Sequence, residues 1–180
     1  MFAMDIKEII GQIFGIIAVI LGFCIYQVKD AKKLLLVQIL TSAVFCIHYG
    51  LIGALSGFVL NGVGIVRSTV YYYRDKKIFS GKYIPVLFAV IMAVVGVKFW
   101  EAWYSIFVVL GLVINSYALS FKNPQNLRKS ILITCPMVIV YNAFSYSYGG
   151  IVYESVSIVS GIIGIIRYRG LQQQTSLKNQ

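Results

Sequence analysis

Apolar and basic segments alternate along this chain, and that alternation limits its fold more than any other feature. Thirteen of the sixteen Lys and Arg residues fall in four short stretches, 29–33, 74–82, 122–129 and 167–178. Seven apolar runs lie between or beside these stretches, each near the length of about 17 to 25 residues that spans a bilayer as a helix. We therefore predict an all-α integral membrane protein, in agreement with a hydrophobic content of 59% and a mean hydropathy of +0.82.

The seven runs predict one transmembrane domain, residues 1–180, with short loops because each helix satisfies its own backbone groups. Residues 170–180 are expected to form a cytoplasmic tail, whose polar part, residues 172–180, should be frayed. The first run is kept as a span, since no basic segment precedes it and it has no convincing small-residue cleavage site. The expected spans are 8–28, 34–52, 56–73, 83–98, 102–120, 130–147 and 150–166.

The basic residues also predict the orientation in the membrane. The first, third and fifth loops and the tail contain the clustered cations, whereas the N-terminus and the other loops contain only Lys7 and Lys98. Because Lys and Arg are enriched on the cytoplasmic side, the N-terminus should lie outside and the C-terminus inside. The net charge of +10 then meets anionic lipid headgroups. No nucleic-acid partner is expected, because so little polar sequence leaves no soluble basic face.

Enzymatic and redox functions find little support in the sequence. Cys24, Cys46 and Cys135 fall inside apolar spans, without a metal-binding spacing or an exposed pair. They are interpreted as small buried hydrophobes. HExxH, a Walker loop, a carboxylate pair within one span and a nucleophile with a matched base are all missing from the sequence. We therefore expect no enzyme, no cofactor and no metal.

Residues 8–74 and 102–167 share one plan, which predicts an internal repeat. Each has a span running inward, a basic loop, a span running outward, a tight outer turn and a third span that ends at an Arg. The fourth span, 83–98, inverts the chain between them, so that two parallel three-helix bundles enclose a central space, as in some transporters. Matching positions are Gly57 and Gly150, Asn61 and Glu154, and Arg74 and Arg167.

A second alignment of the two halves is also open. It pairs Gly64-Ile65-Val66-Arg67 with Gly164-Ile165-Ile166-Arg167. The first alignment is preferred, because it places both terminal arginines, Arg74 and Arg167, at the inner membrane surface.

Two segments, IHYGLIGALSGFVLNG (47–62) and VYNAFSYSYGGIVYES (140–155), resemble the YgjV family of small bacterial inner-membrane proteins. The resemblance extends over the whole chain and implies a multi-pass protein of the bacterial inner membrane. The three-one-three plan is also similar to that of the SWEET, PQ-loop and PnuC-like transporters, with little sequence likeness. Pro124-Gln125 stands near an inner loop, whereas PQ-loop proteins keep that dipeptide within a helix, so it does not support the second likeness.

Five polar side chains inside the spans are candidates for a binding site, because such groups are costly in a bilayer unless they face the bundle interior or water. A rise of about 1.5 Å per residue places four of them roughly 6 to 8 Å below the outer turns, two in each half, and the fifth, Arg67, roughly 15 Å below Gly57. The candidates are His48, Asn61, Arg67, Asn142 and Glu154.

Together these side chains suggest the polar floor of an outward-opening pocket. Asn61 and Asn142 offer donors and acceptors to a small polar solute. Glu154 could orient His48 or take a cationic group, and Arg67 could receive an anionic one. A proton shared by Glu154 and His48 would allow exchange of the solute against a proton.

Each candidate also has a purely structural explanation. His48 could be a neutral, hydrogen-bonded imidazole, and the two amides could link helices for about 0.6 to 2 kcal/mol each. Glu154 could reach the headgroups, and Arg67 could extend toward the cytoplasmic surface. A small-solute transporter or facilitator is therefore the first hypothesis, with a non-transporting accessory or scaffold protein as the alternative.

Several properties are left open by the sequence. A membrane enzyme that acts on a lipid or quinone through His48 and Glu154 is a third and weaker hypothesis. The identity of the solute and its coupling to protons or ions stay undetermined. The sequence is compatible with a monomer or a homodimer in the bilayer.

Overall fold

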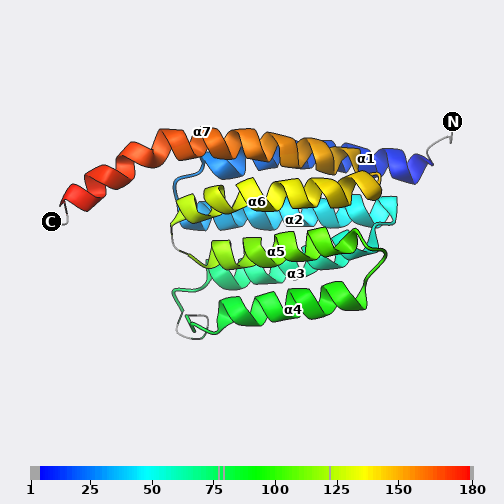
Figure 1. Ribbon diagram of the computed structural model, residues 1–180, viewed down its shortest axis with the longest axis horizontal. Helices are drawn as coiled ribbons and strands as arrows, with labels where there is room; N and C mark the ends of the chain where they lie inside the picture. The colour runs from blue at the N-terminus through cyan, green and yellow to red at the C-terminus, as the bar shows by residue number, and fades with distance from the viewer. Residues whose placement is uncertain (1–4, 77, 79, 122, 179–180) are drawn as a thin grey trace.

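A computed structural model describes residues 5–76, 78, 80–121 and 123–178, with side chains described as far as Tyr168. These residues form seven helices that run side by side, and they contain no strand (Figure 1). Four helices are long and apolar enough to cross a membrane. The predicted all-α membrane fold is therefore confirmed. The helices are α1 Ile6–Gln27, α2 Ala31–Ile52, α3 Leu55–Tyr72, α4 Ile84–Lys98, α5 Ser105–Ser120, α6 Pro124–Phe144 and α7 Tyr148–Lys178.

Local sequence signals explain where several helices begin and end. The Asp30 side chain accepts a hydrogen bond from Lys33 N and caps α2. The α2 helix is followed by its C-terminal cap Gly53, whose φ of 77° suits glycine because it has no Cβ. Tyr146, just after α6, also has a positive φ, 54°. These two are the positions with left-handed backbone among the described residues.

The sixth and seventh helices differ from their predicted bounds. The α6 helix begins at Pro124, six residues before the expected start at 130. Asn123 caps it through Gln125 N, and Pro124 occupies the first turn, where a missing N–H costs nothing. The Pro124-Gln125 dipeptide therefore lies in a helix and not in a loop. The expected frayed tail is helical as far as Lys178, and residues 179–180 lie outside the described residues.

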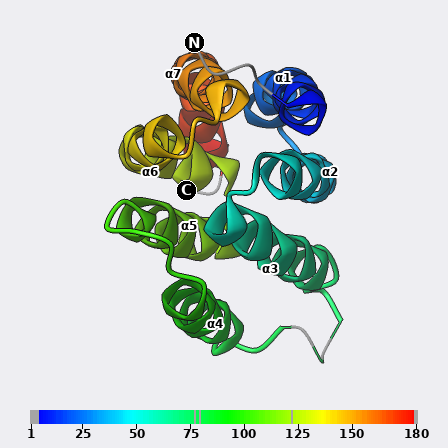
Figure 2. The same cartoon turned by 90° about the vertical axis from the view of Figure 1, so that its right-hand side faces the viewer.

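The helices pack as two sets of three with α4 at one side. Within each set, successive helices contact one another: α1 with α2, α2 with α3, α5 with α6, and α6 with α7. The sets meet at both margins, through α1 with α7 and α3 with α5, whereas α4 packs on α3 and α5. Seen from one end, α2 and α6 face each other between these margins (Figure 2). We call α1–α3 the first triplet and α5–α7 the second triplet.

Apolar side chains cover both the inside and the outside of the bundle. Buried side chains of both triplets form two clusters, one around Leu34, Leu35 and Leu127 and one around Phe45 and Tyr141. Large apolar side chains are exposed as well, many of them on α1 and α4. In a soluble protein such a surface would be an interaction site, but in a bilayer it faces lipid.

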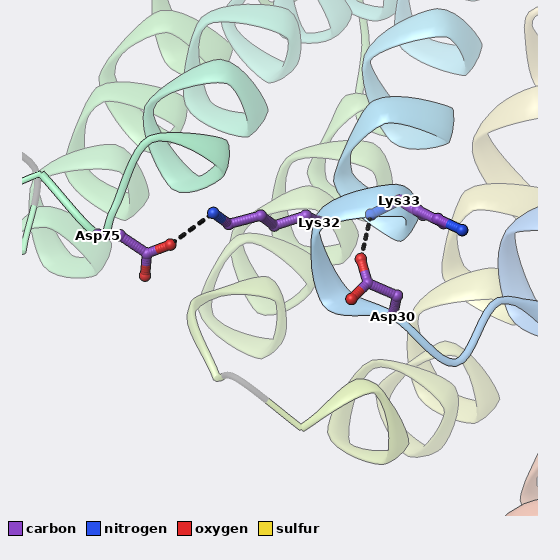
Figure 3. Close-up of polar contacts among 4 residues, drawn as sticks. All are labelled: Asp30, Lys32, Lys33 and Asp75. Atoms are coloured by element: carbon purple, nitrogen blue, oxygen red, sulfur yellow. Dashed lines mark hydrogen bonds and ion pairs between the residues drawn. The ribbon is translucent and has the colours of Figure 1, made fainter.

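The loops after α1 and α3 meet at one end of the bundle. Lys32 Nζ lies 2.7 Å from Asp75 Oδ2 and joins the start of α2 to the chain after α3 (Figure 3). Both side chains are 56% exposed, so this ion pair adds little stability. The contact shows that two of the basic stretches lie together, as the alternating direction of the helices requires.

Candidate functional site

A cavity of about 50 Å³ lies in the middle of the bundle, between the two triplets. Every helix except α4 contributes to its wall. The cavity has room for a few water molecules or a small ion. It is lined by Tyr26, Gln38, Thr41, Ser42, Phe45, Tyr49, Asn61, Val108, Gly111, Leu112, Asn115, Thr134, Cys135, Val138, Tyr153 and Glu154.

Two of the five predicted site residues, Asn61 and Glu154, lie on this wall. Asn61 Nδ2 donates a 2.9 Å hydrogen bond to Gly57 O, one turn earlier in α3. Its Oδ1 accepts no hydrogen bond from the described residues. The Glu154 carboxyl, on α7, contacts the thiol of Cys135, a weak donor on α6. The structure thus brings these two side chains from opposite triplets to one space.

His48 lies outside the cavity wall, fully buried where α2 meets α1 and the turn before α7. Its Nδ1 is 2.7 Å from Gly11 O, and its Nε2 is 2.6 Å from Ser147 Oγ. A carbonyl can only accept, so Nδ1 carries the proton, and in the neutral ring Nε2 accepts from Ser147. Ser147 Oγ in turn accepts from Gly150 N. His48 thereby links the two triplets.

Asn142 belongs to the same hydrogen-bonded layer and does not line the cavity. Its Oδ1 accepts a 2.6 Å hydrogen bond from the hydroxyl of Tyr49, and its Nδ2 is buried without a partner. The adjacent Tyr141 accepts at its hydroxyl from Gly57 N and donates to Glu101 Oε2. This layer therefore joins α2, α3 and α6 near the end of the bundle opposite the basic loops.

Arg67 is only 1% exposed and is also absent from the wall. Its Nη1 lies 3.9 Å from Met92 Sδ on α4, and its Nε is buried without a partner. No described carboxylate lies within 4 Å of the guanidinium. Its Nη2 and the Oγ of Ser42, a wall residue, both lie within 4 Å of the point where a Cβ on Gly64 would stand. The guanidinium is therefore close to the cavity without lining it.

The five candidates thus fall into three groups, and their role in binding stays a prediction. Asn61 and Glu154 share the cavity, His48 and Asn142 belong to the hydrogen-bonded layer, and Arg67 is isolated between α3 and α4. The sequence predicted one polar layer of four side chains. In the structure these four form two pairs, one on the cavity wall and one in the hydrogen-bonded layer.

Several polar wall residues were not predicted from the sequence. Ser and Thr in an apolar run are ambiguous, because their hydroxyls often bond to a carbonyl one turn earlier, as Thr41 Oγ1 does to Val37 O. One signal could have identified Thr41 and Thr134. They have the same separation in sequence as Asn61 and Glu154, so they occupy equivalent positions of the predicted repeat. The outer-loop carboxylate of Glu101 was also missed, and it accepts from Leu55 N at the start of α3.

Comparison with known protein families gives a match. Residues 9–172 match the model of the family Imp-YgjV, described as "Bacterial inner membrane protein". No curated protein and no solved structure matches the chain. The matched range includes all the wall residues of the cavity and both segments, 47–62 and 140–155, on which the resemblance was based.

Proposed function

The chain belongs to the Imp-YgjV family of bacterial inner membrane proteins, and we propose that it carries a small polar solute across that membrane. The observation that supports this function is the cavity with polar lining between the two triplets. Polar groups inside a membrane protein are expensive and commonly mark the path of a substrate or ion. Transporter sites lie between two halves of the protein, and this cavity likewise lies between the two triplets.

We also propose that the two triplets are copies of one unit, related by a pseudo-twofold axis along the membrane normal, with α4 as the inverting helix. The packing supports this, because exchanging the triplets turns the α1–α7 contact into the α5–α3 contact. The backbone supports it as well. Gly53 and Tyr146, with their positive φ values, have the same separation in sequence as Gly57 and Gly150.

The hydrogen bond from Tyr49 to Asn142 is a further argument for the repeat. These residues are 93 positions apart, which is also the separation of Asn61 from Glu154. Two equivalent positions contact each other only where they lie close to the symmetry axis. The alternative alignment, which pairs Arg67 with Arg167, does not relate Tyr49 to Asn142.

The cavity wall is consistent with a site on that axis. Four pairs of wall residues have this same separation, one partner coming from each triplet. An axial position would let the halves rock against each other about the cavity, as in alternating access. Pro136, inside α6 and beside the wall residue Cys135, interrupts a backbone hydrogen bond and supplies a site for bending. The pairs are Thr41 and Thr134, Ser42 and Cys135, Phe45 and Val138, and Asn61 and Glu154.

In this proposal the cavity of about 50 Å³ is the closed form of the site, because a sugar or nucleoside needs more space. The alternative is a non-transporting accessory or scaffold protein. Two observations favour this alternative: His48 and Asn142 are completely buried, and their side chains form hydrogen bonds between helices.

A binding screen followed by an uptake assay separates the two functions. Sugars, nucleosides, vitamins and amino acids are first tested for a rise in the unfolding temperature of the purified protein, because a ligand of the native state stabilises it. Uptake of the stabilising solute is then measured in proteoliposomes. Asn61→Ala should abolish uptake, whereas Asn126→Ala, an amide outside the wall, should not. If no solute stabilises the protein, or if Asn61→Ala transports normally, the transporter hypothesis is wrong.

A further inference from the structure

Several oxygens on the cavity wall are free to accept from a guest. The Thr41 hydroxyl donates its hydrogen to Val37 O at 2.8 Å, so towards a guest its oxygen can only accept or coordinate. Asn61 donates one of its two amide hydrogens to Gly57 O, and its Oδ1 accepts no hydrogen bond from the described residues. Asn115 has a buried Oδ1 without a partner. These three groups, from α2, α3 and α5, therefore present acceptors.

Glu154 adds a carboxylate to the same wall, from α7. None of the sixteen described wall residues is Lys, Arg or His, so this wall offers no positively charged side chain to the carboxylate. Arg67 does not line the cavity, and the Cys135 thiol beside Glu154 is only a weak donor. A carboxyl group in a membrane interior is costly in its charged form, so it takes up either a proton or a compensating cation.

The size and charge of the site restrict the guest. About 50 Å³ accepts an ion with one or two waters and excludes a larger organic cation. One carboxylate balances one positive charge, whereas Ca²⁺ sites gather several carboxylates and six to eight oxygens. The hydroxyls of Ser42 and Thr134 rotate and present an oxygen to such an ion when needed.

We infer that the cavity is a binding site for a small monovalent cation, held by the Glu154 carboxylate and by uncharged oxygens of both triplets. The uncharged ligands are Asn61 Oδ1, Asn115 Oδ1 and Thr41 Oγ1. Because the ligands come from opposite triplets, the bound cation would hold the closed form together. This inference rests on the proposed function, in which the cation is the coupling ion or the transported species.

The test is cation-dependent stability of the full chain in detergent. Unfolding is measured in LiCl, NaCl, KCl and NH₄Cl, with choline chloride keeping the ionic strength constant. At least one small cation should raise the unfolding temperature with a saturable concentration dependence, and choline should not. Glu154→Gln should abolish this response, whereas Glu8→Gln, an exposed carboxylate outside the wall, should retain it.

A second variant covers the case in which Glu154→Gln does not fold. Thr41→Val keeps the shape of the side chain and should raise the half-saturating cation concentration about tenfold, the effect of losing one contact to a charged group. The inference is overturned if wild type responds to all salts as it does to choline, or if the half-saturating cation concentration is unchanged in the wall variants that fold. Uptake without cation dependence would overturn this inference alone, whereas cation binding without any uptake would overturn the transporter.

Discussion

The hydroxyl of Tyr49, on α2, donates a 2.6 Å hydrogen bond to Oδ1 of Asn142, on α6, and both side chains are buried. The bond joins the two central helices of the triplets directly beside the cavity. The Nδ2 of Asn142 has no hydrogen-bond partner, so the Tyr49 hydroxyl is what orients this amide among the described residues. Loss of the hydroxyl should therefore weaken the contact between the triplets.

Tyr49→Phe tests this relationship. The change removes one hydroxyl and leaves the amide of Asn142 unsatisfied, so the free energy of unfolding should fall by about 1 to 2 kcal/mol. Unfolding in mixed SDS micelles measures it. Tyr117→Phe is the matched control, because that tyrosine is 52% exposed on α5. Equal stability of the two variants would mean that the buried bond contributes nothing.

A pair of glycines sets the distance between α1 and α7. A Cβ on Gly15 would stand 2.8 Å from the Cα of Gly149 and 3.1 Å from Cε1 of His48. Backbone atoms cannot move aside as side chains do, so Gly15→Ala should lower the unfolding free energy by about 1 to 3 kcal/mol. Gly62→Ala, on α3, meets no atom within 4 Å and should stabilise by up to about 1 kcal/mol. Thermal unfolding of both variants measures these changes. A Gly15→Ala variant as stable as wild type would contradict the close packing of α1 against α7.

The helical membrane fold was predictable because hydropathy and basic loops report directly on membrane spans. The start of α6 was not, because Arg128 and Lys129 make residues 124–130 look like a loop. Arg128 is nevertheless buried, and it donates from Nε to Tyr26 O and from Nη2 to Val28 O. Its charge is thus compensated by carbonyls at the end of α1, a long-range pairing that no local pattern reveals.

The site was predictable only in part, for a similar reason. Asn61 and Glu154 were identified because an amide or carboxylate stands out in an apolar run. Depth along the helix is also readable from sequence, but the direction of a side chain depends on how the helices rotate as they pack. The sequence therefore left His48 open to a place in the pocket or to the role of a hydrogen-bonded imidazole, and in the structure it points to Gly11 and Ser147.

Arg128→Ala should destabilise the contact between α6 and the end of α1. The variant leaves the carbonyls of Tyr26 and Val28 without their donor and removes a third bond, to Gln125 Oε1. We expect a loss of about 2 to 3 kcal/mol in the unfolding free energy. Lys129→Ala, the exposed neighbour, should change it by less than about 0.5 kcal/mol. Chemical unfolding of both proteins provides the comparison, and similar values would show that the buried guanidinium is dispensable.

Arg67→Met separates a functional from a structural arginine. The guanidinium is buried without a carboxylate partner, so an apolar side chain of similar length should leave stability unchanged or raise it by about 1 kcal/mol. Uptake should nevertheless be lost if Arg67 receives an anionic group of the solute, and Arg67→Lys should retain part of it. Unfolding and proteoliposome uptake are measured on the same preparations. A variant that is less stable yet transports normally would assign Arg67 a structural role.

The orientation of the bundle can be tested at its two ends with single cysteines in a background in which Cys24, Cys46 and Cys135 are replaced. Lys29→Cys lies in the loop after α1, among the basic residues, and Trp100→Cys lies in the loop after α4, at the opposite end. Since cytoplasmic loops are enriched in Lys and Arg, a maleimide that does not cross membranes should label Trp100→Cys in intact spheroplasts. It should label Lys29→Cys only after lysis. The reverse pattern would invert the proposed topology, with the N-terminus inside and the C-terminus outside.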